Sequence, residues 1–202
     1  IETPTGEMLV NDNGTYRTGH KFLDAGYDSD GIPKFIRAAF TAARAANPNA
    51  RLMWCDYSAE RTFQTAKRNA LLNAATKLHD EGICDGVALQ GHYDNNDFAA
   101  STDWPNMVKP LTDKSMSFSI TEFDVAIGLG SITSTSLQQQ CVHETAQGAK
   151  LAGAKMLITW CMRDPESWRG ASAQPLPFDV AGRFSKMTGD TRIGFWLTPD
   201  ST

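Results

Sequence analysis

The chain has 202 residues, of which 41% are hydrophobic and 21% are charged, enough to bury one sizeable core and unlike the composition of a disordered segment. Its formal net charge of −4 and its 19 scattered lysines and arginines argue against a nucleic-acid partner. No apolar run approaches the ~18 residues that span a bilayer, so we expect no membrane partner.

Four cysteines lie far apart in the sequence, without a Cys-x-x-Cys pair and without a histidine at metal-binding spacing. This spacing does not indicate a zinc site, and we expect no metal. It is compatible both with one or two disulfides and with four buried thiols. The cysteines are Cys55, Cys84, Cys141 and Cys161.

Stretches with the composition of strands alternate along the chain with stretches of helical periodicity. The first predicted helix starts after the turn at Asp28–Gly31, tolerates Pro33 in its first turn and ends at Asn47–Asn49. The predicted strands are Arg51–Cys55, Val87–Leu89, Ser115–Val125 and Lys155–Trp160. The later predicted helices are Glu60–His79, Trp104–Leu111 and Ser136–Ala152, the last with Ser136 as its cap.

This alternation predicts parallel strands joined by right-handed crossovers, in either an open doubly wound sheet or a barrel. No glycine-rich phosphate loop follows any predicted strand, which argues against a dinucleotide-binding fold. Reactive side chains stand at the carboxyl end of every predicted strand. They are Asp56 and Tyr57, Gln90 and His92, Glu122 and Asp124, and Trp160, Arg163 and Asp164. In a (β/α)8 barrel these ends converge on one face, where the active site is assembled.

The two acids near the end of the third predicted strand are the most informative. An unpaired carboxylate in an apolar setting costs several kcal/mol or shifts its pKa, so Glu122 and Asp124 call for a partner or a reaction. Taken alone, a structural ion pair or an edge strand with one wet face explains them equally well. A buried core histidine is the alternative for His92, and a cap of the following helix is the alternative for Asp56.

With these residues in place, the chain resembles the glycoside hydrolase family 10 xylanases from Gly14 to Asp179. The similarity lies in the order and spacing of short runs. These runs are Gly14–Arg17, Asn47–Ala50, Asp56–Tyr57, Gly86–His92, Ile120–Val125, Trp160, Asp164 and Ser167–Gly170. The resemblance implies a (β/α)8 TIM barrel, of which this chain covers about strands 5–8 and their helices, and one catalytic domain over residues 1–202.

The resemblance also implies roles for the strand-end residues. Glu122 is implied as the catalytic nucleophile, with His92 and Asp124 holding it in position. The implied substrate-binding residues are Tyr57, Gln90, Trp160 and Trp168. A tryptophan in a polar loop such as Ser167–Gly170 more often contacts a ligand than a core, and sugar rings stack on indole faces.

The acid/base glutamate of the family ends its fourth strand, close to where this chain begins. Glu2 is the first candidate, because Pro4 and Gly6 make a poor strand before Glu7, the second candidate. An ordinary solvated terminal acid is the alternative for both. The chain also departs from the family at Cys55, where asparagine is usual, which puts the polar contacts of that strand in question.

The resemblance predicts a retaining endo-1,4-β-xylanase that acts on xylan and xylo-oligosaccharides, is secreted and needs no cofactor. The alternatives are a noncatalytic relative that binds xylan or β-glucan, and a fragment inactive without an N-terminal half. A barrel enzyme acting on a small carbonyl substrate is disfavoured, because no predicted strand ends in a lysine. Strands 5–8 alone leave two unpaired edges, so we expect a fragment, a piece of a split enzyme or a unit completed by a second polypeptide segment.

Overall fold

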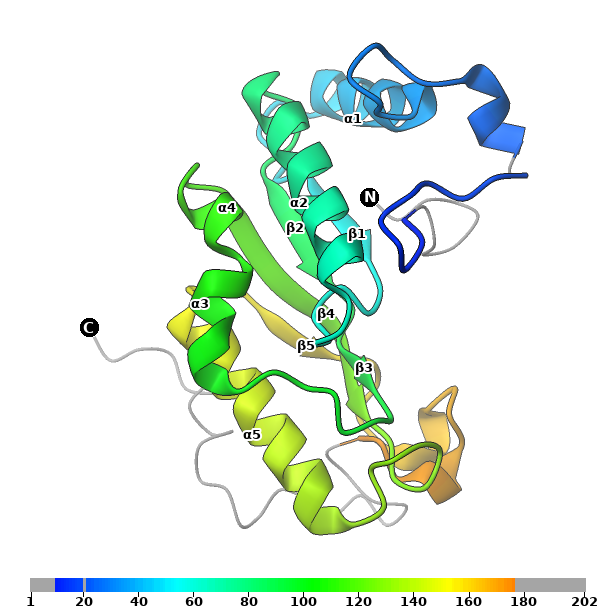
Figure 1. The fold of residues 1–202 in the computed structure, drawn as a ribbon, viewed down its shortest axis with the longest axis vertical. Coiled ribbons are helices and arrows are strands. Elements are labelled where there is room, and N and C mark those ends of the chain that lie inside the picture. Colours follow the sequence, from blue (N-terminus) through cyan, green and yellow to red (C-terminus); the bar gives the residue numbers. More distant parts are fainter. Residues whose placement is uncertain (1–9, 20, 177–202) are drawn as a thin grey trace.

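The computed structural model describes residues 10–19 and 21–176, and the strands within them pair in parallel (Figure 1). These strands are β1 (Met53–Asp56), β2 (Gly86–Leu89), β3 (His92–Tyr93), β4 (Ser117–Val125) and β5 (Leu157–Thr159). Strand β4 is central, because it pairs with β2, β3 and β5, while β1 pairs with β2. The parallel sheet predicted from the alternating elements is therefore confirmed.

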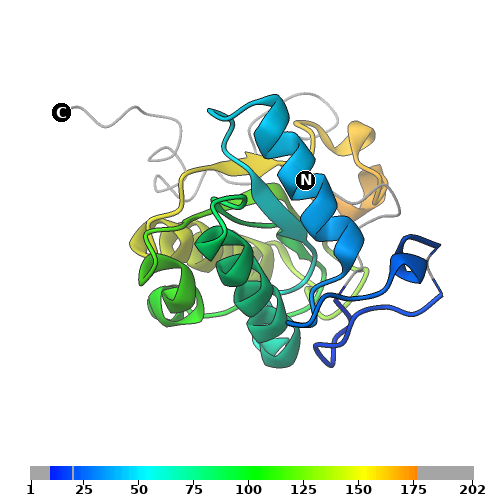
Figure 2. The same cartoon turned by 90° about the horizontal axis from the view of Figure 1, so that it is seen from above.

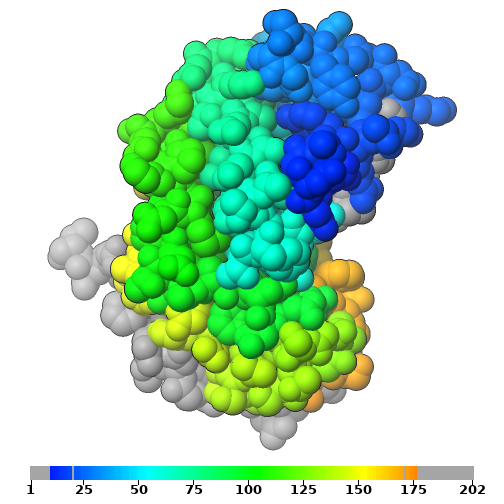
Figure 3. Space-filling model, viewed as in Figure 1, coloured from blue at the N-terminus to red at the C-terminus, as the bar shows by residue number. Residues whose placement is uncertain are grey.

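Helices occupy the connections between the strands. They are α1 (Lys34–Ala46), α2 (Thr65–Asp80), α3 (Trp104–Met107), α4 (Lys109–Thr112) and α5 (Thr135–Leu151), with short 3-10 turns η1 (Lys21–Ala25), η2 (Ser101–Asp103), η3 (Asp164–Glu166) and η4 (Ala171–Ala173). The view from above shows the helices ranged beside the sheet (Figure 2), and α1, α2 and the α3–α4 segment form one continuous surface (Figure 3). Among the described residues, no helix has the length and apolar character needed to cross a membrane.

The hydrophobic core lies between the sheet and these helices. Phe40 of α1 packs against Trp54 of β1, with ring centroids 6.4 Å apart. Leu71 and Leu78 of α2 are buried in the same cluster as Phe118 of β4. The central strands β2 and β4 are buried on both faces, and removing this apolar surface from water drives the assembly.

Helix α2 begins later than the sequence predicts. It starts at Thr65, not at Glu60, because residues 57–64 form a loop held by other bonds. In that loop the buried Glu60 carboxylate accepts the N–H of Gly91 at 3.0 Å. The backbone N–H of Thr62 donates to the carbonyl of Asp97 at 3.0 Å. These bonds tie the loop after β1 to the region around β3.

Two further helix boundaries differ from the predictions. The helix predicted at 104–111 is divided into α3 and α4, which meet at Val108. Pro110 lies in the first turn of α4 and has no N–H to bond to the preceding turn, which interrupts a continuous helix there. The N-cap of α5 is Ser134, whose hydroxyl accepts the N–H of Leu137 at 3.3 Å, and not Ser136.

A break between β2 and β3 sets the register at the carboxyl end of the sheet. The backbone N–H of Glu122 bonds to the carbonyl of Gln90 at 2.9 Å, and that of Asp124 to the carbonyl of Gly91 at 3.2 Å. Gly91 has a φ of +84°, and a Cβ there would lie 2.7 Å from the Cγ2 of Ile120. Glycine is therefore required at the break that places His92 beside Asp124.

The contact between α5 and α3 depends on a second glycine. Gly148 in α5 faces the fully buried indole of Trp104 in α3. A Cβ at Gly148 would lie 2.1 Å from Cδ1 of that indole, well inside van der Waals contact. The absence of a side chain at this position lets α3 approach α5.

Replacing Gly148 with alanine should lower the free energy of unfolding by about 1–3 kcal/mol. Overpacking against Trp104 outweighs the ~1 kcal/mol that alanine adds to a helix. Urea unfolding followed by circular dichroism measures the change. Gln147→Ala, one residue earlier in α5, is the matched control and should stay within ~0.5 kcal/mol. An unchanged midpoint for Gly148→Ala would show that α3 moves aside without cost.

Candidate active site

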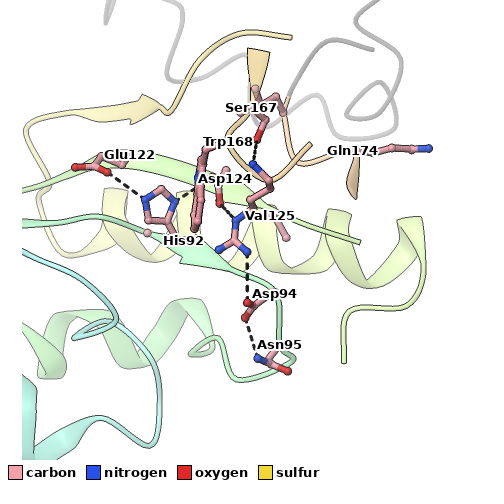
Figure 4. Close-up of polar contacts among 12 residues, drawn as sticks. His92, Asp94, Asn95, Glu122, Asp124, Val125, Ser167, Trp168 and Gln174 are labelled. Carbon is pink, nitrogen blue, oxygen red and sulfur yellow. Dashed lines mark hydrogen bonds and ion pairs between the residues drawn. The ribbon is translucent and has the colours of Figure 1, made fainter. Parts of the chain in front are cut away.

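The structure brings four of the predicted site residues, His92, Glu122, Asp124 and Trp168, together beside the end of β4 (Figure 4). His92 opens β3 and pairs in register with Asp124 of β4. Glu122 precedes Asp124 by two residues in the same strand. Trp168 comes from the segment that follows β5 and reaches the same place. Residues separated by up to about half of the described chain thus meet at one end of the sheet.

His92 lies between the two carboxylates. Its Nε2 is 3.1 Å from Oε2 of Glu122, within hydrogen-bond distance. Its Nδ1 is 3.0 Å from Oδ2 of Asp124, a charge contact rather than an aligned hydrogen bond. Glu122 is 3% exposed and Asp124 is 1% exposed, so both carboxylates are screened from water.

The surroundings of His92 favour its charged form. Burial disfavours the imidazolium, but the contacts with Asp124 and Glu122 outweigh burial and raise the pKa of His92 to about 9. At neutral pH the ring is therefore a cation between two carboxylates. These contacts give both ring nitrogens a partner, as a satisfied core histidine also has, so that alternative stays open beside a catalytic role.

Asp124 receives two further donors from the segment after β5. The indole Nε1–H of Trp168 donates to Oδ2 at 3.0 Å, and Nε–H of Arg169 donates to Oδ1 at 2.9 Å. Arg169 also lies 3.4 Å from Oδ2 of Asp94. The sequence predictions did not include Arg169. The signal was its place in the polar run Ser167–Gly170, directly after a tryptophan predicted to line the site.

Two indole rings flank His92. The ring of Trp168 is 5.3 Å from that of His92 between centroids, and the ring of Trp160 is 6.4 Å away, both edge-on. Trp168 is 63% exposed and Trp160 is 41% exposed. Such large apolar surfaces beside buried charges can contact a ligand that has both apolar faces and hydroxyl groups.

Gln90 and Tyr57 lie in different surroundings. Gln90 is buried, and its side-chain Nε2 has no hydrogen-bond partner among the described residues. One face of the Tyr57 ring is covered, because Nζ of Lys67 stands 3.2 Å from the ring centroid. The substrate-binding roles predicted for Gln90 and Tyr57 stay predictions.

Asp56 is part of a buried ion pair and does not cap a helix. Its Oδ1 lies 3.1 Å from Nζ of Lys67, and both side chains are buried. Burial raises the pKa of Asp56 to about 6, although Lys67 and the N–H of Tyr57 oppose that rise. The alternative of a helix cap does not fit Asp56, since α2 begins after Gln64. Lys67 of α2 reaches back to the end of β1 to make this ion pair.

The remaining predicted features divide into described and undescribed parts of the chain. Glu2 and Glu7 lie outside the described residues. The four cysteines are free thiols, and Sγ of Cys55 lies 3.7 Å from Oγ1 of Thr121, a weak polar contact at the position where the family usually has asparagine. Within residues 10–19 and 21–176, no group of three or more His, Cys, Asp or Glu side chains is arranged to hold a metal ion.

Comparison with known proteins identifies the family of this chain. The family model described as Glycosyl hydrolase family 10 matches residues 6–185. The chain belongs to glycosyl hydrolase family 10. Endo-1,4-beta-xylanase A of Thermotoga neapolitana is 30% identical over 164 residues, which cover 73% of this chain. The match covers only 15% of that relative, so the chain spans a small part of its length.

Solved structures of family 10 members have the same fold. Native xylanase 10B from Thermotoga maritima superposes with a TM-score of 0.72 at 24% identity, covering 90% of this chain and 57% of that one. Xylanase 10B from Thermotoga petrophila RKU-1, solved in complex with xylobiose, gives a TM-score of 0.72 at 24% identity, covering 91% and 56%. These proteins are (β/α)8 barrels, so the predicted fold is confirmed and the parallel sheet is part of such a barrel.

Replacing Asp124 with asparagine should lower the pKa of His92 from about 9, because the amide keeps the shape of the carboxylate but not its charge. NMR titration of the ring measures the change. The folded pKa of His92 is raised above ~6.5, so its contribution to stability is complete below pH ~6.5 and disappears as pH rises through about 9. Asp124→Asn should lose most of this pH dependence of unfolding.

Asp103→Asn, in η2, is the control for this titration. It removes a carboxylate that lies outside the contacts of His92, and the ring should titrate as in the wild type. A His92 pKa that stays at about 9 in Asp124→Asn would show that Asp124 does not hold the proton on the ring.

Proposed function

We propose that this protein is a retaining endo-1,4-β-xylanase in which Glu122 is the nucleophile. The single observation that carries the proposal is the buried Glu122 carboxylate in contact with a cationic His92, with two exposed indoles beside it. Family membership and the names of the relatives support a glycoside hydrolase acting on xylan. The xylobiose bound to a structurally similar protein supports a xylo-oligosaccharide ligand.

The proposed mechanism is a double displacement. The Glu122 carboxylate attacks the anomeric carbon and forms a glycosyl ester, while the C–O bond to the leaving sugar breaks and that oxygen takes a proton from the acid/base residue. The same residue then removes a proton from water, which attacks the anomeric carbon and releases Glu122. The reaction requires two carboxyl groups and no cofactor.

His92 supports the first step through its charge. An imidazolium 3.1 Å from Oε2 of Glu122 stabilises the ionised carboxylate, which is the form that attacks. The contact with Asp124 keeps the proton on the ring at neutral pH. The charged His92 therefore favours the ionised form of Glu122, which is the form that attacks, at neutral pH.

The tryptophans supply the proposed binding surface for the sugar. A pyranose ring presents flat C–H faces, which stack on the exposed faces of Trp168 and Trp160. The proposed substrate is a polymer too large to enter a cell intact. This supports secretion of the protein, which stays a prediction.

Glu122→Gln should abolish turnover while leaving xylo-oligosaccharide binding in place. The amide keeps the volume of the side chain but cannot form the glycosyl ester, so kcat should fall by a factor of about 10³ or more. The assay is release of reducing ends from xylan by the protein in its full natural length, with titration calorimetry for binding. Glu81→Gln, at the far end of α2, is the control and should keep wild-type kcat.

Activity of Glu122→Gln within tenfold of the wild type would reject Glu122 as the nucleophile. A wild-type protein that binds xylo-oligosaccharides but releases no reducing ends would favour the noncatalytic alternative.

Trp168→Ala should weaken xylo-oligosaccharide binding by roughly 1–3 kcal/mol, because it removes the stacking surface. Trp168→Phe keeps an aromatic face but loses the N–H that binds Asp124. It should therefore keep most of the affinity while lowering kcat. Calorimetry and initial rates on the two variants separate stacking from support of Asp124. Equal affinities for wild type and Trp168→Ala would remove Trp168 from the binding surface.

The acid/base residue is assigned by chemical rescue. Without its acid/base, a retaining enzyme still forms the glycosyl ester from substrates with good leaving groups, and azide then attacks in place of water. Azide should therefore restore turnover and yield a β-glycosyl azide in Glu2→Ala but not in Glu122→Ala. Rescue of Glu7→Ala in place of Glu2→Ala would reverse the order of the two candidates.

A further inference from the structure

Arg169 is a buried cation of this site to which no role has been assigned above. Its side chain is 6% exposed. Its Nε–H donates to Oδ1 of Asp124 at 2.9 Å, and its guanidinium carbon stands 4.6 Å over the ring of Trp168. Its Nη1 lies 3.4 Å from Oδ2 of Asp94, which in turn binds Arg61 at 3.0 Å. The two carboxylates that Arg169 contacts, Asp124 and Asp94, are labelled in Figure 4.

We propose that Arg169 is a positioning residue of this site, which acts through Asp124: its positive charge offsets that carboxylate and so limits how firmly Asp124 holds the proton of His92 beside Glu122. The inference rests on the proposed role of Glu122. Arg169 and His92 bind different oxygens of Asp124, so the carboxylate is held on both sides. The positive charge of Arg169 therefore competes with His92 for the same carboxylate.

Arg169 also balances charge in the buried site. Glu122, Asp124, Asp94 and Asp97 bring four carboxylates, and the cations His92, Arg169 and Arg61 contact them at 3.4 Å or less. Burial makes an unpaired charge costly in free energy. Removal of one cation should therefore strengthen the interaction of the carboxylates with the remaining cations. His92 is the imidazole among these cations, and its titration reports the change in charge around it.

The groups that face His92 fix the sign of the expected effect. Glu122 and Asp124 of β4 contact its ring, and Glu60 is coupled electrostatically to it, although burial raises the pKa of the Glu60 carboxyl and favours its neutral form. Arg61 binds the backbone carbonyl of His92 at 2.8 Å. Trp160 and Trp168 flank the ring edge-on and carry no charge. Without the cation of Arg169, the attraction of Asp124 for the ring proton is less opposed, and His92 should hold that proton to higher pH.

The test is NMR titration of the His92 ring in the full chain. The sequence holds four histidines, and a His92→Gln spectrum assigns the signal. Arg169→Gln should raise the midpoint by about one pH unit, because it keeps a donor but removes the charge. Arg169→Lys keeps the charge and should shift the midpoint by less than ~0.5 unit. Arg163→Gln, an exposed arginine on the same segment, is the control and should titrate as the wild type.

An unchanged or lowered midpoint in folded Arg169→Gln would overturn the proposal, because it would show that Arg169 packs without controlling Asp124. A second measurement needs no substitution and serves if Arg169→Gln does not fold. In the wild type, the Nε–H resonance of Arg169 should shift with the same midpoint as the His92 ring, since both bind Asp124. An Nε–H resonance that does not respond at that midpoint would equally overturn the proposal.

These readings are made without substrate, so they separate this proposal from the proposed function. A protein that shows the Arg169-dependent shift but no xylan hydrolysis would contradict the xylanase function alone. A protein that hydrolyses xylan and shows no shift in Arg169→Gln would contradict the role of Arg169 alone.

Discussion

The organisation of the site follows from two carboxylates buried on one strand. Glu122 and Asp124 carry like charges, which repel each other more strongly in a buried site than in water. His92, placed between them, turns repulsion into two attractions. Arg169 adds a second cation to the buried Asp124 carboxylate. This contact brings the segment after β5 back to the end of β4. Loss of the central imidazolium would leave two buried charges without a cation between them.

The position of His92 depends in turn on the backbone. The left-handed Gly91 breaks the strand between β2 and β3 and shifts His92 opposite Asp124. Glu60, from the loop after β1, holds the N–H of Gly91 in place. Burial raises the pKa of Glu60, so this carboxyl resists ionisation. The loop at residues 57–64, where the sequence predicted the start of a helix, thus helps to position the site.

The alternation of elements and the positions of the reactive residues were predictable because they follow from local periodicity. Buried runs and polar strand ends occur close together in the sequence, which is why Glu122, Asp124 and His92 were found. The contact of Arg169 with Asp124 joins residues 45 positions apart through side-chain direction, which periodicity does not encode. Neighbouring candidates with similar chemistry were also hard to separate, and the choice between Ser134 and Ser136 as the cap depended on φ/ψ angles.

The indole of Trp168 has two proposed roles, and these couple sugar binding to the protonation of His92. Its exposed surface is proposed to stack on a sugar ring, while its N–H donates to the Asp124 carboxylate, which keeps the proton on His92. A sugar that moves the indole would change the proton affinity of His92. Because linked equilibria are reciprocal, deprotonation of His92 would change the affinity for the sugar by the same factor. Ligand binding near the pH at which the imidazole titrates would then exchange protons with the buffer. The heat of binding would depend on the ionisation enthalpy of that buffer.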